Sequence, residues 1–235
     1  MNWKVPRIWE DGDVWILGGG PSVAEQFDIP KEIVESVRAG TSPLNVFSPY
    51  LSPLHNKHVI GINVAYQIGD WIDMVFFGDS GFYLSHRPKL ALFPGVKVTC
   101  HNGARSESWV KYLGRDGRKP RGISSAPNLV SWNGNSGASA ISVAAWSGAK
   151  RIILLGFDMK LSTDNHQHWH DAYKRGVINV NDERKRRKLP FDRHLRGFPE
   201  IAEDAKRMGI TILNASPDSA IQCFEKICVK DIIGI

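Results

Sequence analysis

The sequence predicts an α/β fold with a doubly wound, mostly parallel, Rossmann-like sheet. Short apolar runs, typical of strands buried on both faces, alternate with segments of helical periodicity. Consecutive parallel strands need crossover helices, so this alternation indicates a parallel sheet. The chain has 235 residues, 42% of them hydrophobic, which suits a single nucleotide-binding domain over residues 1–235.

Four strands are expected in the first half of the chain. The first covers residues 14–17 and stops at three glycines, after which Ser22 begins a helix. The others cover residues 59–63, 74–77 and 96–100. The segment 41–56 is rich in Pro, Ser and Asn and is predicted to be a loop or lid excursion. Residues 103–122 are too polar and too rich in glycine to belong to the core.

The second half contains the clearest unit of the sequence. A helix with alanine and aliphatic residues is expected over 138–149, followed by a buried strand over 151–158. The polar segment 159–197, rich in His and Arg, has the length of a functional loop or lid. An amphipathic helix over 199–209 then ends at a glycine, and residues 210–214 form the last expected strand.

Charge and composition limit the partners of the chain. The formal net charge of +6 and the pI of about 9.3 favour an anionic partner. The basic run 182–188 is expected to be a solvated loop, with contact to phosphate or nucleic acid as the alternative. Three cysteines at no ligand-like spacing predict neither disulfides nor a cysteine zinc site. No segment has the length and apolarity of a membrane span or a signal peptide, so we expect a cytoplasmic protein.

Residues that follow the expected strands should meet at one edge of the sheet, because parallel strands end on the same side. The glycine turn after the first strand is suited to a phosphate, since glycines allow unusual backbone conformations and a close approach. It matches neither the dinucleotide fingerprint nor the P-loop, so we expect no NAD, and no haem either. A tight turn without a ligand is the structural alternative. The candidates are Gly18, Gly19, Gly20, Pro21, Ser22, Asn63, Asp79, Ser80 and Asp158.

Two further groups carry potential chemistry. Asn135, Ser136 and Gly137 precede the alanine-rich helix and can supply a second set of donors there, or simply cap it. His166, His168 and His170 alternate around a tryptophan and would share one face of an extended segment, which suits substrate, phosphate or divalent metal. His194 lies shortly before the last helix and can take a proton from an attacking hydroxyl, or be an ordinary surface histidine.

Four blocks in this order resemble two related families. They are the glycine turn, Asn63 with its neighbours, the segment 134–159, and the closing helix and strand that lead into Pro217-Asp218-Ser219. One family is the 6-hydroxymethylpterin diphosphokinase-like (MptE-like) family, which has many bacteriophage members. The other is the bacterial sialyltransferases with a single Rossmann-like domain, which use a cytidine monophosphate sugar donor. The resemblance covers about residues 12–222.

The resemblance to sialyltransferases implies a glycosyltransferase with a nucleotide-sugar donor. It places nucleotide binding on Gly18 to Ser22, on Asn63, on Ser136 and Gly137, and on Ser219, and it makes His194 the catalytic histidine. Asp79 stands where those enzymes have an asparagine. Because a carboxylate cannot donate the hydrogen bonds of an amide, this departure leaves the selectivity for cytidine open.

The diphosphokinase-like resemblance implies another transferase. There a diphosphate moves from ATP with magnesium, and Asp79 and Asp158 would hold the metal in the catalytic site. A third expectation is a non-catalytic nucleotide-binding or phage structural protein that keeps the fold. If the chain is encoded by a phage, its compartment is the host cytoplasm, and its positive charge admits DNA as well as an acidic glycan or a small molecule as the acceptor.

Overall fold

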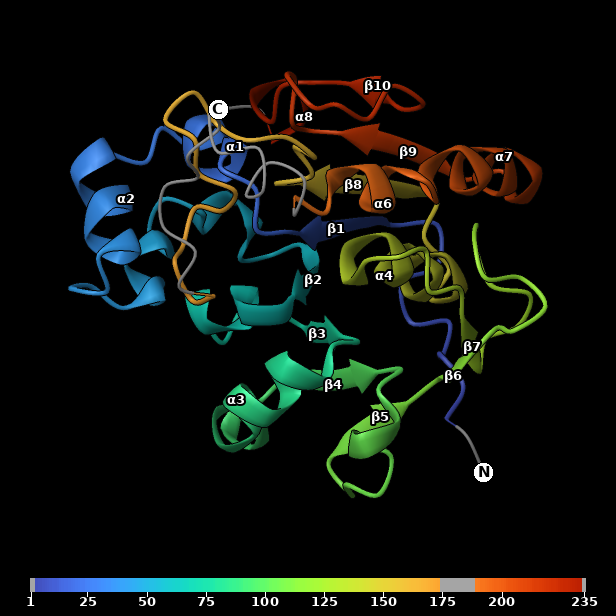
Figure 1. Cartoon of the computed structure of the whole chain (residues 1–235). Helices are drawn as coiled ribbons and strands as arrows, with labels where there is room; N and C mark the ends of the chain where they lie inside the picture. Colours follow the sequence, from blue (N-terminus) through green and yellow to red (C-terminus); the bar gives the residue numbers. More distant parts are fainter. Residues whose placement is uncertain (1–2, 174–188, 234–235) are drawn as a thin grey trace.

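Eight parallel strands form one sheet in the computed structural model, which describes residues 3–173 and 189–233 (Figure 1). The order is β10-β9-β8-β1-β2-β3-β4-β5, and each neighbouring pair is parallel. This confirms the predicted Rossmann-like α/β class. The strands are β1 (Asp13–Leu17), β2 (His58–Ile62), β3 (Met74–Phe77), β4 (Val96–Thr99), β5 (Val110–Tyr112), β8 (Arg151–Leu155), β9 (Thr211–Asn214) and β10 (Glu225–Lys226).

The strand order changes direction beside β1. From β1 the chain adds β2, β3, β4 and β5 on one side, and it later returns to place β8, β9 and β10 on the other. Trp15 of β1 therefore pairs with Val59 of β2 and with Ile153 of β8. In sheets of this type, ligands bind outside the carboxyl ends of the strands where the order reverses. The ends of β1 and β8 are thus the first place to look for a site.

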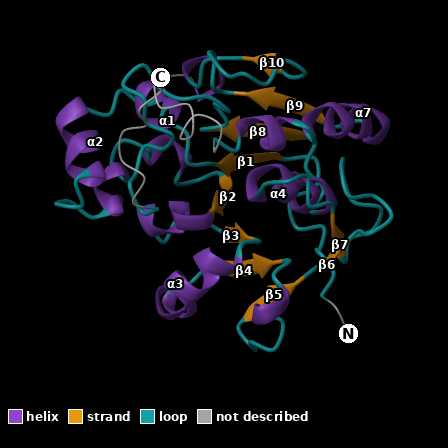
Figure 2. Cartoon of the chain, in the orientation of Figure 1, coloured by secondary structure: helices purple, strands orange, loops and turns teal. Residues whose placement is uncertain are grey.

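Helices cover both faces of the sheet (Figure 2). Successive side chains of a strand point to opposite faces, and β1 follows this rule. Trp15 and Leu17 pack with the core on the side of the first three helices, whereas Val14 and Ile16 pack on the side of α4 and α7. The helices are α1 (Ser22–Gln26), α2 (Lys31–Arg38), α3 (Ser80–Leu92), α4 (Ser136–Trp146), α6 (Phe191–Leu195), α7 (Phe198–Met208) and α8 (Lys230–Ile233).

The helix lengths and ends agree with their sequences. α7 ends at Gly209, which takes the left-handed conformation (φ +68°) that a glycine at this place allows, as predicted.

α3, with 13 residues, is the longest helix in the described part of the chain. A helix needs about 20 apolar residues to cross a bilayer. Within residues 3–173 and 189–233, none has the length and apolarity for this.

Three residues of the segment 41–56 belong to the core, so the expectation that this segment lies outside the core is wrong. It forms two short 3₁₀ helices, η1 (Leu44–Phe47) and η2 (Ser52–Leu54). Phe47, Leu51 and Leu54 are completely buried in the hydrophobic core. These residues stand at i, i+4 and i+7, which is a helical spacing, but three prolines interrupt the segment, so the sequence does not indicate a continuous helix although tertiary packing buries them.

Two other strand predictions need correction. Residues 103–122 contain the edge strand β5 as well as β6 (Gly114–Arg115), which pairs with β7 (Leu129–Val130) in a small second sheet. Leu113 between them is completely buried. The strand at 211–214 is not the last one, because β10 pairs with it in parallel. The four missed strands, β5, β6, β7 and β10, are only two or three residues long, too short for an alternating pattern to appear.

The polar segment 159–197 is described in two parts, 159–173 and 189–197. The first part packs onto the sheet through Trp169, which is completely buried. The second part contains α6 and leads directly into α7. The basic run 182–188 lies outside the described residues, so the prediction of a solvated loop there stays a prediction.

Candidate functional site

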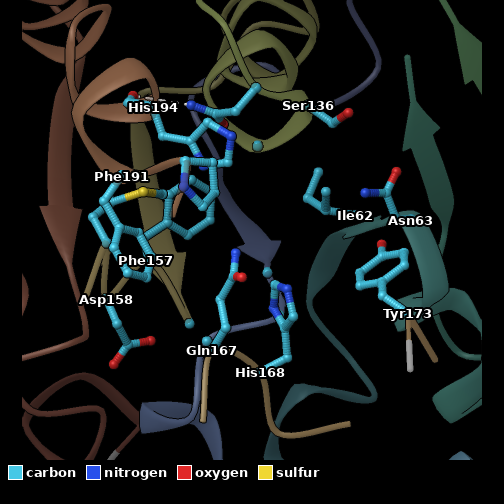
Figure 3. A pocket seen from close by; sticks show the side chains of 18 of the residues that line it. Ile62, Asn63, Ser136, Phe157, Asp158, Gln167, His168, Tyr173, Phe191 and His194 are labelled. Atoms are coloured by element: carbon cyan, nitrogen blue, oxygen red, sulfur yellow. Dashed lines mark hydrogen bonds between the residues drawn. The ribbon is translucent and has the colours of Figure 1, made fainter. Parts of the chain in front are cut away.

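A pocket of about 280 Å³ lies at the carboxyl edge of the sheet (Figure 3). Most residues predicted from the sequence line it, and they come from seven separate segments of the chain. Pro21, Ser22, Ser80, His166 and Ser219 do not line it. The predicted residues that line the pocket are Gly18, Gly19, Gly20, Asn63, Asp79, Asn135, Ser136, Gly137, Asp158, His168, His170 and His194.

The glycines of the turn after β1 are needed for space and not for an unusual backbone conformation. None of the three has a φ in the left-handed region. A Cβ on Gly18 would lie 2.8 Å from the carbonyl oxygen of Gly156, and one on Gly20 would lie 1.7 Å from Asp158 Oδ2. A Cβ on Gly19 would lie 2.9 Å from His168 Nδ1. The expected conformational role is therefore wrong, and close approach by protein groups replaces it.

The backbone donors of this turn are mostly occupied. Gly18 N–H donates to Leu155 O at 2.8 Å, and Gly20 N–H donates to Gly156 O at 2.9 Å. The N–H of Ser22 is directed to Asp158 Oδ1 at 3.3 Å, and proline at position 21 has no N–H. The helix α1 that follows has only five residues and so a small dipole. The turn thus offers an anion far fewer donors than its sequence suggests.

The N-terminus of α4 has the open donors that the glycine turn lacks. Asn135 is the N-cap residue, and its Oδ1 accepts from Ala138 N–H at 2.7 Å. The first two helical residues, Ser136 and Gly137, have N–H groups with no acceptor among residues 3–173 and 189–233. Unsatisfied N–H groups and the positive end of the helix dipole favour an anion. Gly137 is required here because a Cβ would lie 2.9 Å from the ring of Phe157.

His194 lies beside this helix start. The Asn135 side-chain amide donates to the carbonyl of His194 at 3.1 Å, which ties α6 to the cap of α4. Gly134 has φ +78°, and a Cβ there would lie 3.1 Å from Arg193 O. The Arg193 guanidinium is 3.3 Å from His194 Nε2. Because guanidinium groups only donate, a hydrogen bond in this contact requires Nε2 to be the unprotonated ring nitrogen.

His168 and His170 are fixed over the glycine turn by the tryptophan between them. Trp169 donates its N–H to Gly19 O and its indole N–H to Gly18 O, both at 3.0 Å. The two imidazoles stack in parallel with 5.1 Å between their centroids. The shared face predicted for the alternating histidines is therefore confirmed for these two. His166 is instead turned to Asp164, 3.9 Å away, and does not line the pocket.

His170 is a neutral donor in this arrangement. Its side chain is only 5% exposed, and burial lowers its pKa well below 6.5. Ala172 N–H donates to its Nδ1 at 3.2 Å, so the ring proton resides on Nε2. A Cβ on Gly19 would lie 3.3 Å from this Nε2. This donor is thus next to Gly19, the one glycine of the turn whose N–H donates to no acceptor in the described residues.

Asp158, after β8, sits in a buried polar network below the pocket. The Ser22 hydroxyl donates to its Oδ2 at 3.0 Å and lies 2.9 Å from the hydroxyl of Ser216. Burial raises the pKa of Asp158 to about 6, although the bonds from Ser22 act in the opposite direction. Ser219 donates to Phe157 O at 2.6 Å and is 2% exposed. Ser22 and Ser219 therefore hold the residues that follow β8 in place through hydrogen bonds, without lining the pocket.

Asn63 and Asp79 follow β2 and β3 on another side of the pocket. Asn63 has φ +51°, a region that asparagine tolerates better than most residues, and its buried Oδ1 has no donor among the described residues. Asp79 caps α3, with its Oδ1 accepting from Phe82 N–H at 2.9 Å. Asp79 is exposed. Figure 3 shows Ile62 and Asn63 across the pocket from Phe157 and Phe191.

Asp79 and Asp158 do not form the pair of metal ligands that the diphosphokinase alternative needs. They follow β3 and β8, and β1 and β2 lie between these strands. Each carboxylate is turned to a protein partner of its own, Phe82 N–H for one and Ser22 for the other. No group of three or more His, Cys, Asp or Glu side chains suited to a metal occurs in residues 3–173 and 189–233.

Several pocket residues were missed in the sequence. They lie within four positions of residues that were singled out, so the sequence neighbours of those residues were the available signal. Only the tertiary structure shows that the aromatic residues face the same cavity. The missed residues are Ile62, Phe82, Trp132, Gly134, Gly156, Phe157, Met159, Lys160, Gln167, Tyr173, Pro190, Phe191 and Arg193.

Comparisons with known proteins find similarity in structure only. No family model and no curated protein sequence matches the chain. The MAf glycosyltransferase from Magnetospirillum magneticum AMB-1 has a TM-score of 0.55 and 11% identity, and the match covers 97% of this chain and 35% of that one. This chain therefore spans about a third of that protein. At this identity the likeness shows the fold.

The sialyltransferase CstII from Campylobacter jejuni is also similar. Its complex with a trisaccharide acceptor and CMP has a TM-score of 0.47 and 14% identity, with 92% of this chain and 86% of that chain covered. Its complex with the substrate analogue CMP-3FNeuAc has a TM-score of 0.45 at the same identity and coverage. The likeness to the MAf glycosyltransferase has the higher TM-score, and it shows a shared fold at low sequence identity.

Proposed function

We propose that this chain is a glycosyltransferase that takes its sugar from a nucleotide-sugar donor. The observation that carries the proposal is the open N-terminus of α4, where Ser136 and Gly137 direct two free N–H groups into a pocket shared with His194. The fold likeness to a MAf glycosyltransferase adds support. Fold alone does not imply function, so the proposal depends on the site.

The donor phosphate next to the sugar binds at the start of α4. Two N–H groups, the Ser136 hydroxyl and the helix dipole face it there, and Lys160 and Arg193 also line the pocket. When the bond between sugar and phosphate breaks, negative charge grows on the phosphate oxygen. Donors already in place stabilise this charge more in the transition state than in the bound donor, which accelerates the reaction.

His194 acts as the general base. Its neutral Nε2 takes the proton of an acceptor hydroxyl while that oxygen bonds to the anomeric carbon, and the nucleotide leaves with the electrons of the broken bond to the phosphate oxygen. The proton acceptor is the atom that Arg193 contacts at 3.3 Å. This contact is long for a hydrogen bond and exposed, so an acceptor hydroxyl can replace it.

The other predicted functions have weaker support. A magnesium-dependent diphosphokinase would need Asp79 and Asp158 on one metal, and these residues follow strands separated by two others. A non-catalytic nucleotide-binding or phage structural protein would need no base beside α4. DNA as the acceptor is favoured only by the net charge of +6, and a phage origin and a cytoplasmic location stay predictions from the sequence.

Isothermal titration with CMP, UDP, GDP and ATP, each with magnesium and with EDTA, tests the proposal. We expect at least one nucleotide and its sugar conjugate to bind in EDTA, because the donors described above are protein groups. Binding of ATP alone, and only with magnesium, would favour the diphosphokinase. If no nucleotide binds, the proposed function is wrong.

The His194→Ala variant tests the mechanism. Release of nucleotide from the bound donor should slow by about 10²- to 10⁴-fold, as is usual for loss of a general base, with little change in nucleotide affinity. The matched control is His58→Ala, because His58 is an exposed histidine at the amino end of β2, away from the pocket. Equal rates in the two variants would remove His194 from the mechanism.

A further inference from the structure

The charged residues of the pocket are divided between its two ends. Lys160 and Asp158 follow β8, and Arg193 belongs to α6, which is tied to the start of α4. The Asp158 carboxyl is turned to Ser22 and burial raises its pKa to about 6, so the two cations outweigh it at this end. Asp79 follows β3. Three strand spacings separate β8 from β3, which is about 14 Å at about 4.8 Å each. One end of the pocket therefore attracts anions and the other repels them.

Asp79 is the acidic group of the repelling end. Its Oδ1 is engaged by Phe82 N–H at the start of α3, and Oδ2 is free of this cap. Arg115 approaches the same strand end, but its guanidinium lies 4.2 Å from the centre of the Trp132 ring and donates to Gly78 O at 3.3 Å. Arg115 does not line the pocket, so the carboxylate is the charge that a ligand meets there.

Asn63 completes this end with an uncharged polar group. Its amide lines the pocket, and its buried Oδ1 has no donor in the described part of the chain. A buried oxygen without a donor is costly, and a hydroxyl or amino group of a ligand would satisfy it after a small rotation of the amide. Carboxylate and amide together suit a ligand rich in O–H or N–H groups.

We infer that the sugar of the donor binds at the end formed by Asn63 and Asp79 and is neutral or carries an amino group, whereas an acidic sugar is disfavoured. The inference rests on the proposed function, because the phosphate must lie at the start of α4 for the sugar to extend past β2 toward β3. A sugar carboxylate would meet the Asp79 carboxylate with like charge, and hydroxyl groups would donate to it. Asp79 is thus a specificity-determining residue.

Pairs of donors that differ only in the charge of the sugar test this inference. The pairs are UDP-glucose with UDP-glucuronate, GDP-mannose with GDP-mannuronate, and the methyl ester of CMP-sialate with CMP-sialate, titrated at low salt because Asp79 is exposed. For the nucleotide that binds, we expect the neutral partner to bind about fivefold more tightly or better. In Asp79→Asn this ratio should fall towards one.

The Asp79→Asn variant is informative because asparagine still caps α3 through its side-chain oxygen. The matched control is Asp73→Asn, which removes a carboxylate just before the amino end of β3, where Asp73 accepts from Val59 N–H at 2.8 Å. Its ratio should equal that of the wild type. An acidic donor that binds as tightly as its neutral partner, or a ratio unchanged in Asp79→Asn, would overturn the inference.

The outcome also separates this inference from the proposed function. If free nucleotides bind but the neutral donor is not preferred over the acidic one, or the preference is unchanged in Asp79→Asn, only the assignment of Asp79 fails. The phosphate site at the start of α4 then remains. If neither free nucleotides nor donors bind, the proposed function fails, and the inference fails with it.

Discussion

The turn after β1 and the start of α4 look alike in sequence but differ in what they offer a ligand. Both place glycine and serine before a helix at the same edge of the sheet. In the turn, carbonyl oxygens of β8 take up the N–H groups of Gly18 and Gly20, and protein atoms fill the space beside each glycine. At α4, the N–H groups of Ser136 and Gly137 stay open. A glycine-rich turn therefore marks close packing as readily as a phosphate site.

The largest effect that this comparison predicts is on stability. In Gly20→Ala the new Cβ would lie 1.7 Å from Asp158 Oδ2 and 2.6 Å from Gly156 O, so the buried network must move. We expect the free energy of unfolding to fall by about 3 kcal/mol in urea titrations. Gly117→Ala is the control, because nothing lies within 4 Å of a Cβ there. A loss for Gly20→Ala no larger than the control would show that the turn is loosely packed.

A pH dependence of stability comes next. The pKa of Asp158 rises from its ordinary value of 3.8 to about 6 in the folded protein, so the folded state binds more protons between these values. The free energy of unfolding should therefore decrease as pH rises from about 4 to about 6, by about 2 to 3 kcal/mol from this group. Asp158→Asn should lose this part of the slope. Identical slopes in the two proteins would contradict burial as the dominant cause.

A smaller effect should appear in nucleotide affinity at the start of α4. Ser136→Pro removes the N–H of the first helical residue, a position where proline is tolerated, and Asn135 before it is already extended (φ −155°, ψ 154°). We expect affinity to fall about tenfold in calorimetry, since a hydrogen bond to a charged group is lost. Ser136→Ala keeps the N–H and should lose less. Equal losses of affinity in the two variants would show that the Ser136 hydroxyl, and not its N–H, makes the contact.

The smallest effect concerns the cap itself. Asn135→Ala removes the bond to Ala138 N–H and the bond to His194 O, and should lower the free energy of unfolding by about 1 kcal/mol. Asn135→Ser restores a capping oxygen and not the amide donor. Chemical denaturation should show partial recovery for serine, while the rate of nucleotide release stays low because α6 is no longer tied. Full recovery of both the stability and the release rate in Asn135→Ser would show that the function of His194 does not depend on the amide of Asn135.

Much of the site was predictable because it lies at strand ends. The buried runs that became β1, β2, β3 and β8 are bounded by Gly18, Asn63, Asp79 and Asp158, and parallel strands bring such residues to one edge. The start of α4 was also predictable, since Asn135 is a good cap. The core role of Phe47 was not, because it depends on contacts with Trp169, whose ring centre is 4.9 Å away and 122 positions along the chain.

The sequence by itself determined the alternation of strands and helices, the helix ends at Asn135 and Gly209, and the edge where polar residues gather. These features depend on local periodicity and capping, which involve residues a few positions apart. Only the tertiary structure decided which N–H groups remain open to a ligand and that Asp79 and Asp158 lie apart. It also decided that Trp169, through its hydrogen bonds, places His168 and His170 over the glycine turn. These depend on which distant segments meet, because a donor is free only when no other part of the chain reaches it.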